Sequence, residues 1–271
     1  MITFPNAKIN LGLNIVERRA DGYHNIETVF YPVPLTDVLE IVPADALSLT
    51  CYGNKVDCPP EKNLVMKAYR LMQQHYAVPP VAMHLYKHIP DGAGLGGGSS
   101  DAAHALLMLN RIFDLGIADD QLAAMAATLG ADCAFFVYNR PLMATGIGDV
   151  FTPVDVDLKG KSLLLVKPPV GVDTRTAYSR VTPQAPAVPL PDVISRPMPA
   201  WDGLLVNDFE PSVFAALPQL WLIKARLLDA GAQYAAMSGS GSTVYGIFDS
   251  DKLAEAAADT FADYATFVLP L

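Results

Sequence analysis

Alternation of apolar and polar residues along the chain predicts a series of β-strands. The alternation is strictest from Ile9 to Ile15, where every second residue is aliphatic. A turn should follow over residues 18–24, because Asp21-Gly22 is typical of a hairpin tip. Similar but shorter patterns predict further strands at residues 27–31, 38–42, 81–89, 142–145, 161–167, 234–237, 243–248 and 266–269.

A second periodicity, with apolar residues three or four positions apart, predicts helices between these strands. Residues 63–75 place Leu64, Ala68 and Leu71 on one helix face. Another helix should begin at Asp119 and end at Gly130, a suitable C-cap. Further helices are expected at residues 102–113, 219–228 and 252–262. The mixture of elements predicts an α+β architecture.

Two stretches interrupt these patterns. The periodicity weakens over residues 151–160, so we expect two domains, residues 1–152 and residues 153–271. Six prolines fall within residues 181–199, and they predict a loop or an irregular arm rather than core structure.

Composition restricts the class of protein. The chain has 271 residues, of which 51% are hydrophobic and 17% charged, so a large folded core is expected. The net charge of −9 argues against nucleic-acid binding, although it permits a local site for a small anion. The three cysteines match no zinc spacing, and residues 1–8 contain no signal-peptide core. No apolar run is long enough to span a membrane, so we expect a soluble cytoplasmic protein.

The candidate chemistry begins with glycine, because five of the seven residues from Gly92 to Gly98 are glycines. The loop lies between a predicted strand and a predicted helix, for which Ser99 or Ser100 would be the N-cap. Free amides of a glycine loop and a helix N-terminus form an anion site, typically for phosphate. A merely flexible loop is the alternative.

Known phosphate loops can be compared with this one. No lysine follows the glycines, which excludes the Walker A motif. Residues 92–97 do match G-x-G-x-x-G, but they lie a third of the way along the chain, and the acidic residue that follows, Asp114, is not convincingly placed. A dinucleotide site is therefore the weaker interpretation.

Other residues leave two interpretations open. Asp132 could cap a helix, or it could act as a base or metal ligand. Lys8, Tyr23 and His24 could be solvated, or they could bind a ligand. The Ser-Gly-Ser-Gly-Ser loop at residues 238–242 could contact phosphate or only connect two strands, and residues 207–210 are most simply a helix cap.

Taken together, these segments resemble the GHMP kinase superfamily. The glycine loop is similar to its motif P-x-G-A-G-L-G-[GS]-[GS]-[SA], and the blocks at residues 7–13 and 18–24 are similar to the branch that acts on a methylerythritol derivative. Segments at residues 130–132, 144–148, 207–210 and 238–242 follow in the family's order. One departure is Ala134, where the family usually has proline.

The resemblance implies a fold and a reaction. The fold has an N-terminal half like ribosomal protein S5 domain 2 and a ferredoxin-like C-terminal half. The reaction is phosphoryl transfer from ATP, with Mg²⁺, to the 2-hydroxyl of a cytidine diphosphate derivative of methylerythritol. The partner would be this small molecule, not nucleic acid or a membrane, and the chain would be a monomer or a weak homodimer. A kinase of another small alcohol, or a non-catalytic nucleotide sensor, are the alternatives; the presence of both Lys8 and Asp132 favours catalysis.

The resemblance also assigns roles to residues. Asp132 would be the catalytic base, with Lys8 as its partner. Asn10, Tyr23, His24, Asp132 and Tyr178 would bind the substrate, with the two tyrosines and His24 at the cytosine. ATP would be bound by Asn63, Pro90, Asp91, Gly92, Ala93, Gly94, Leu95, Gly96, Gly97, Gly98, Ser99 and Ser100. No metal ligand is assigned among the side chains.

Overall fold

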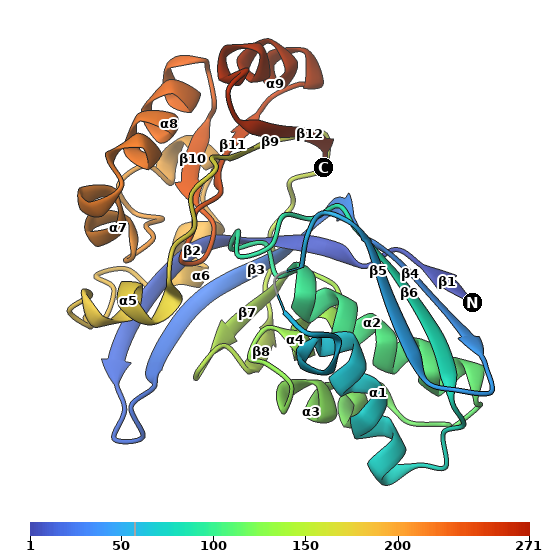
Figure 1. Cartoon of the computed structure of the whole chain (residues 1–271). Helices are drawn as coiled ribbons and strands as arrows, with labels where there is room; N and C mark the ends of the chain where they lie inside the picture. Colours follow the sequence, from blue (N-terminus) through green and yellow to red (C-terminus); the bar gives the residue numbers. More distant parts are fainter. Residues whose placement is uncertain (57) are drawn as a thin grey trace. The chain divides into compact units, whose positions relative to one another are not determined.

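The computed structural model describes residues 1–56 and 58–271, and its chain forms two compact units (Figure 1). Unit 1 contains residues 1–7, 35–91 and 96–140, and unit 2 contains residues 8–34, 92–95 and 141–271. The chain passes from one unit to the other several times, and twice within the glycine loop. The expected domain boundary between residues 152 and 153 divides the chain by sequence and stays a prediction.

Unit 1 combines a four-stranded sheet with four helices. The strand order is β1-β4-β6-β5, antiparallel except for the parallel pair β5 and β6. Figure 1 shows α1 and α2 side by side along this sheet. The elements are β1 (Ile2–Thr3), β4 (Val38–Pro43), β5 (Ser48–Gly53), α1 (Leu64–His75), β6 (Val81–Lys87), α2 (Gly97–Ile112), α3 (Asp119–Ala127) and α4 (Cys133–Tyr138), with a 3₁₀ turn at Pro60–Lys62.

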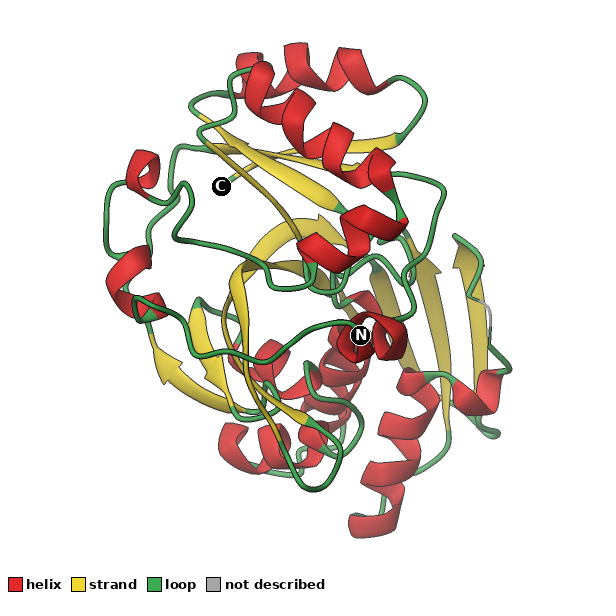
Figure 2. Cartoon of the chain, turned by 90° about the vertical axis from the view of Figure 1, so that its left-hand side faces the viewer, coloured by secondary structure: helices red, strands yellow, loops and turns green. Residues whose placement is uncertain are grey.

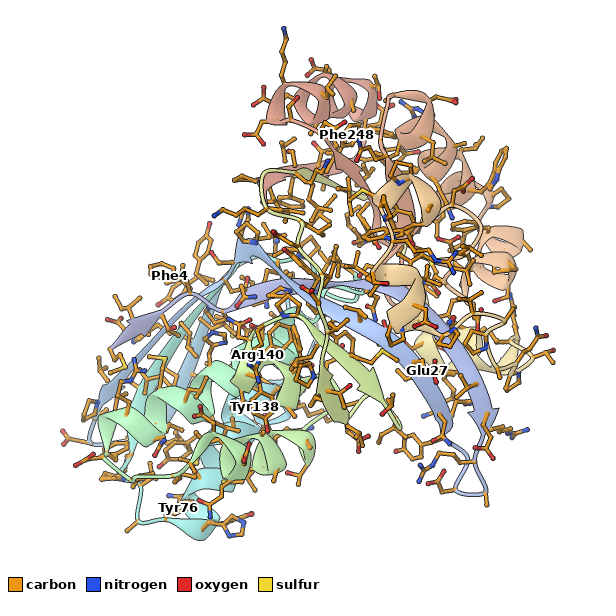
Figure 3. All side chains as sticks on the ribbon, turned by 180° about the vertical axis from the view of Figure 1, so that it is seen from behind. Phe4, Glu27, Tyr76, Tyr138, Arg140 and Phe248 are labelled. Carbon is orange, nitrogen blue, oxygen red and sulfur yellow. The ribbon has the colours of Figure 1, made fainter. Side chains whose placement is uncertain are left out.

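The interior of unit 1 follows the apolar periodicity of its elements. Leu39 and Ile41 of β4, Met83 of β6, and Ala68 and Leu106 of the two long helices are fully buried. Outside this core, Tyr138, labelled in Figure 3, donates a 2.9 Å hydrogen bond to Asp120 and joins α4 to α3.

Unit 2 contains two sheets. The first has the order β2-β3-β7-β8, and the second has the antiparallel order β10-β11-β9-β12. Figure 2 shows α8 and α9 on the same face of the second sheet. The strands are β2 (Asn6–Arg18), β3 (His24–Thr36), β7 (Leu142–Thr145), β8 (Val150–Pro153), β9 (Ser162–Lys167), β10 (Tyr234–Met237), β11 (Val244–Phe248) and β12 (Ala265–Pro270). The helices are α5 (Thr174–Ser179), α6 (Leu190–Ile194), α7 (Glu210–Ala216), α8 (Pro218–Asp229) and α9 (Asp251–Ala258), with 3₁₀ turns at Met198–Ala200 and Asp259–Phe261.

The core of unit 2 lies between the second sheet and its helices. Val166 of β9, Phe248 of β11 and Leu227 of α8 belong to one buried cluster; Phe248 is labelled in Figure 3. Most expected strands and helices of both units are confirmed, including the hairpin between β2 and β3.

Four details of the sequence-based expectations were wrong. The helix after the glycine loop begins at Gly97 and is capped by Gly96, so neither Ser99 nor Ser100 is its N-cap. The helix at Asp119 ends at Ala127, three residues early. The proline-rich segment contains α6, because proline is well tolerated in a first helical turn. Strands β5 and β8 were not foreseen, since most of their residues are exposed and show no burial alternation.

Candidate functional site

The glycine loop uses left-handed backbone conformations to enter α2. Gly92, Gly94 and Gly96 have φ values of 57°, 77° and 72°. Gly96 is the N-cap residue, and α2 then runs for 16 residues. The first amides of a helix have no intrahelical acceptors, and they carry partial positive charge. The local structure is therefore that of an anion site.

Packing explains one of the glycines in the first turn of α2. A Cβ at Gly97 would lie 2.9 Å from Ile89 Cγ2, so a side chain would displace the helix start. The two serines that follow differ in their surroundings. Ser99 is half-buried, whereas Ser100 is fully buried and its hydroxyl lies 3.4 Å from His104 Nδ1.

The start of α2 lies beside the segment that contains Asp132. Burial raises the pKa of the Cys133 thiol to about 11, and the nearby Ser99 side chain opposes this rise. A Cβ at Gly130 would lie 4.0 Å from Ser99 Oγ. Asp132 is half-buried and occupies the N-cap position of α4, yet its carboxylate makes no capping bond. The helix-cap interpretation of its side chain is therefore wrong.

Residues 93–95 of the glycine loop are fixed within unit 2 by hydrogen bonds from two sides. On one side the Lys8 amide donates to the Leu95 carbonyl at 2.9 Å. On the other, Ser238 Oγ donates to the Gly94 carbonyl at 2.8 Å, and the Thr243 amide to the Ala93 carbonyl at 3.2 Å. The serine-glycine loop thus joins β10 to β11 and also holds the glycine loop.

Asn207 also holds the serine-glycine loop through hydrogen bonds. Its Nδ2 donates to the carbonyls of Met237 and Gly239 at 2.7 and 2.8 Å, and its Oδ1 accepts from the Phe209 amide at 3.0 Å. The N-cap position of α7 belongs to Phe209 instead. The expectation that residues 207–210 form a simple helix cap was therefore incomplete.

Lys8 is buried, with only 3% of its surface exposed. Its Nζ donates to Asn10 Oδ1 at 2.6 Å and lies 4.9 Å from the centroid of Phe30. Asn10 Nδ2 in turn donates to Thr28 Oγ1 at 2.9 Å, and the Asn10 carbonyl accepts from Tyr245. Because lysine is seldom buried without a role, the solvated interpretation of Lys8 is wrong.

The structure brings His24 and Tyr178 together in unit 2. Their rings stack at 5.0 Å with an interplanar angle of 22°, and Tyr178 packs edge-on against Phe209 at 4.8 Å. Burial, together with the charge of Arg18, lowers the pKa of His24, so its imidazole is neutral at pH 7. Tyr23 is 62% exposed at the hairpin. The Tyr23 ring is thus open to solvent, whereas the Tyr178 ring is half-buried against His24 and Phe209.

Asn63 is the N-cap of α1. Its Oδ1 accepts from the Val65 amide at 2.9 Å, and its side chain is almost fully buried. The residue therefore has a structural role in the fold, and contact with a nucleotide stays a prediction.

Sequence reasoning missed a buried ion triad in unit 1. Lys87 Nζ binds Asp37 and, at 2.7 Å, Asp101 Oδ2. Asp37 also accepts from the amides of His88 and Ile89 at 2.6 and 2.8 Å. The triad therefore joins the end of β6, where the glycine loop starts, to the second turn of α2. Its members are 50 and 14 residues apart, so no local pattern could identify it.

None of the helices formed by residues 1–56 and 58–271 is long and apolar enough to cross a membrane. No group of three or more His, Cys, Asp or Glu side chains in those residues could hold a metal ion.

Comparison with known families identifies the chain's relatives. Residues 63–140 match the GHMP kinases N terminal domain, and residues 195–265 match the GHMP kinases C terminal domain. A protein of Bacteroides fragilis named 4-diphosphocytidyl-2-C-methyl-D-erythritol kinase is 55% identical over 256 residues, which are 93% of each chain. A protein of Porphyromonas gingivalis with the same name is 50% identical over 264 residues, 96% of each chain.

Solved structures agree with these matches. A crystal structure of 4-(cytidine 5'-diphospho)-2C-methyl-D-erythritol kinase superposes with a TM-score of 0.85 and 32% identity, covering 99% of this chain and 98% of that one. A homoserine kinase from Cytophaga hutchinsonii, at 16% identity and a TM-score of 0.71 over 98% of this chain and 95% of that one, shares the fold. The expected two-domain fold class is thereby confirmed. The chain belongs to the GHMP kinases, a family whose phosphoryl donor is ATP, and within it to the 4-diphosphocytidyl-2-C-methyl-D-erythritol kinases.

Proposed function

We propose that this protein transfers the γ-phosphoryl group of ATP to the 2-hydroxyl of 4-diphosphocytidyl-2-C-methyl-D-erythritol. The observation that carries the proposal is the 55% identity, over 93% of the chain, to relatives named for this substrate. The hydroxyl oxygen attacks the γ-phosphorus, the bond to the β-phosphate oxygen breaks, and ADP leaves. The products are ADP and the 2-phosphate of the substrate, which belongs to the non-mevalonate route to isoprenoid precursors.

The proton of the attacking hydroxyl goes to the carboxylate of Asp132 in this proposal. Asp132 suits the role because its carboxylate is not used to cap α4. Lys8 Nζ would stabilise the charge that develops on the phosphoryl oxygens and the alkoxide. Its attachment to Asn10 holds the ammonium in one orientation, and such preorganisation is what lowers a phosphoryl-transfer barrier.

Phosphate binding is assigned to the segment from Pro90 to Ser100, with the backbone N–H groups after Pro90 as donors. We propose that Mg²⁺ enters with the phosphates, because Mg²⁺ prefers oxygen ligands and is commonly bound through substrate phosphates. Of the two serines, Ser99 is the better candidate to lie near the ion, since Ser100 is fully buried beside His104. Asn63 remains our candidate for the adenine end.

The cytidine end of the substrate is assigned to Tyr23, His24 and Tyr178, with Asn10 and Asp132 at the erythritol. A neutral imidazole can donate one hydrogen bond and accept another, which suits the edge of cytosine. Tyrosine rings suit its faces. The stack of His24 on Tyr178 supports a shared binding surface on unit 2.

Replacement of Asp132 by asparagine tests the catalytic assignment. We expect kcat to fall by roughly 10²- to 10⁴-fold, the usual contribution of a general base, while ATP affinity stays within about twofold. ADP release and ATP titration are measured on the same samples. Asp119→Asn, an exposed carboxylate at the start of α3, is the matched control and should keep full turnover. Turnover of Asp132→Asn at the level of this control would remove Asp132 from the mechanism.

Protection by CDP tests the substrate assignment separately. A ligand that binds only the folded state raises the unfolding temperature, so millimolar CDP should stabilise this protein. Absence of protection would favour a kinase of another small alcohol, and protection without any ADP release would favour a nucleotide sensor. A cytoplasmic location, absence of nucleic-acid binding, and a monomer or weak homodimer remain our predictions.

A further inference from the structure

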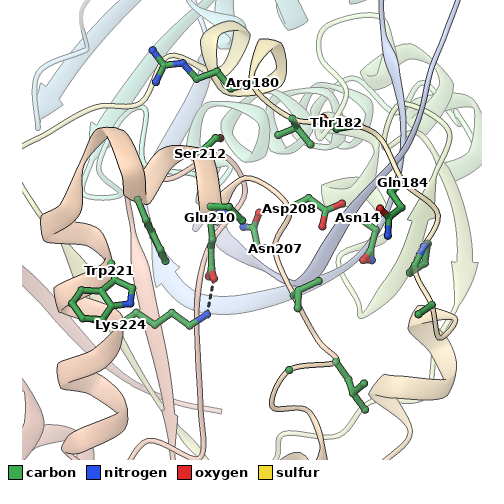
Figure 4. A pocket seen from close by; sticks show the side chains of 18 of the residues that line it. Asn14, Arg180, Thr182, Gln184, Asn207, Asp208, Glu210, Ser212, Trp221 and Lys224 are labelled. Carbon is green, nitrogen blue, oxygen red and sulfur yellow. Dashed lines mark hydrogen bonds and ion pairs between the residues drawn. The ribbon is translucent and has the colours of Figure 1, made fainter.

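Unit 2 contains a cavity that is lined by none of the residues proposed to bind ATP or the substrate. Its volume is about 780 Å³, within the usual range for small-molecule sites. It is bounded by β2, residues 180–188, residues 203–214 and α8 (Figure 4). Neither the glycine loop nor Lys8, His24 or Tyr178 lines it.

One end of the cavity is polar and is organised by β2. The Ile15 carbonyl accepts from the Gln184 amide at 2.8 Å, and the Ile15 amide donates to Asp208 Oδ2 at 2.7 Å. The Asp208 amide donates to the Leu13 carbonyl at 2.9 Å. These bonds fix the backbone on both sides of Asn14. Figure 4 shows the side chains of Asn14, Gln184 and Asp208 gathered at this end of the cavity.

Asn14 has unused hydrogen-bonding capacity. It is only 4% exposed and lines the cavity, and its carboxamide makes no hydrogen bond to any residue in the described part of the chain. A carboxamide that faces a cavity without a protein partner can donate to one ligand group and accept from another. The carboxamide therefore marks a place where a donor and an acceptor of a ligand would be bound.

The charge at this end is negative. Burial raises the pKa of Asp208, and its partner is the Ile15 amide; no Lys, Arg or His in the described residues forms an ion pair with it. Two cations line the cavity. Lys224 already donates to Glu210 Oε2 at 2.6 Å, and Glu210 Oε1 accepts from the Met237 amide. Arg180 is exposed, and Figure 4 shows its guanidinium pointing away from Asn14 and Asp208. Asp208 is thus the carboxylate that remains available to a cation.

Figure 4 shows Trp221 at the opposite end of the cavity, beside the Lys224–Glu210 pair, and this tryptophan is 56% exposed. Leu204 and Leu228, which are 38% and 43% exposed, also line the cavity. An indole face accepts an apolar or aromatic group, and the exposed leucines add apolar area that a ligand would bury.

We propose that this cavity binds a small organic amine, whose ammonium is held by Asp208, Asn14 and Gln184 and whose apolar body packs against Trp221. An ammonium supplies up to three donors, which matches the carboxylate oxygen and the two carboxamide oxygens at the polar end. A carboxylate ligand would be repelled by Asp208, and a purely apolar one would leave Asn14 unbonded.

Tryptophan fluorescence tests the proposal on the full chain. Trp201 is buried, so the exposed Trp221 should report a ligand, and Trp221→Phe should abolish the response. The probe is 2-phenylethylamine, compared with the uncharged 2-phenylethanol and the anionic 3-phenylpropionate. We expect the amine to bind at least 10-fold more tightly than either analogue. Equal responses to the amine and the alcohol would overturn the proposal.

Single substitutions test where the ammonium of the bound amine lies. Asp208→Asn keeps an oxygen that can accept from the Ile15 amide but removes the charge, and it should weaken the amine at least 10-fold while leaving the alcohol unchanged. Asp192→Asn, an exposed residue of α6 outside the cavity, is the control and should change neither. Gln184→Ala alters an exposed side chain and keeps the backbone bond to Ile15, so it tests the same end if Asp208→Asn fails to fold. Unchanged amine affinity in a folded Asp208→Asn or in Gln184→Ala would contradict the assignment.

Discussion

The free energy of unfolding of this protein should fall as pH rises from 5 to 8. Replacement of Asp101 by asparagine should remove that fall. In the ion triad of unit 1 a single ammonium, Lys87 Nζ, serves two carboxylates, Asp37 and Asp101. The side chain of Asp101 is 3% exposed, and its Oδ1 has no hydrogen-bond partner among the described residues. Burial therefore raises the pKa of Asp101 from 3.8 to about 7, although Lys87 opposes the change.

The sign and size of the effect follow from proton linkage. Between pH 3.8 and about 7, folded Asp101 holds a proton that the unfolded chain has released, so the free energy of unfolding falls as pH rises. The slope is about 1.4 kcal/mol per pH unit, which amounts to ~3 kcal/mol between pH 5 and pH 8. Asparagine does not titrate and can still accept a hydrogen bond from Lys87. The stability of Asp101→Asn relative to the unchanged protein should therefore rise by ~3 kcal/mol over this range.

Urea unfolding followed by circular dichroism at pH 5, 6, 7 and 8 measures this difference directly. The comparison between the two proteins cancels the contributions of other titrating groups, such as the half-buried His104. Asp119→Asn, which removes an exposed carboxylate, should show a constant difference across the series. A pH-independent difference for Asp101→Asn, or one that falls with pH, would refute the assignment of the shifted proton to this triad.

Two further substitutions test the hydrogen bonds that hold the glycine loop. Gly94→Ala should destabilise the fold by about 2 kcal/mol or more and weaken ATP binding, because its Cβ would overlap the backbone oxygen of Ser238; Gly92→Ala has the same left-handed backbone but no atom within 4 Å, so it should cost only about 1 kcal/mol. Equal losses in urea unfolding and ATP titration would show that the close approach of Ser238 is unimportant. Asn207→Ala leaves two buried carbonyls and one amide without their partner, and its unfolding free energy should drop by about 2–4 kcal/mol. The exposed Asn54→Ala should lose less than about 1 kcal/mol, and a similar loss in both variants would contradict the role of Asn207.

The parts of the fold that could be predicted are those that local patterns determine. The alternation from Ile9 to Ile15 follows directly from a strand whose aliphatic residues are buried. Asn63 caps a helix whose apolar residues recur at helical spacing, so both the presence of α1 and its start were predictable. The glycine loop was recognisable because its conformations need glycine at Gly94 and Gly96.

The remaining features depend on contacts between distant residues. Burial of Lys8 depends on Phe30 and Asn10, and nothing in its own segment distinguishes it from a surface lysine. The bond between Ser238 and Gly94 joins residues 144 positions apart. The start of α2 was misjudged because serine is the commoner cap, whereas here Gly96 takes the left-handed conformation that begins the helix.

The central claim is that this chain is a kinase of 4-diphosphocytidyl-2-C-methyl-D-erythritol. Its most direct test is ADP release by the purified, folded protein with ATP and Mg²⁺ in the presence of that compound, mevalonate or homoserine in parallel. We predict ADP release that depends on 4-diphosphocytidyl-2-C-methyl-D-erythritol and stays at background with the other two alcohols. ADP at background with all three, or faster release with mevalonate or homoserine, would contradict the claim.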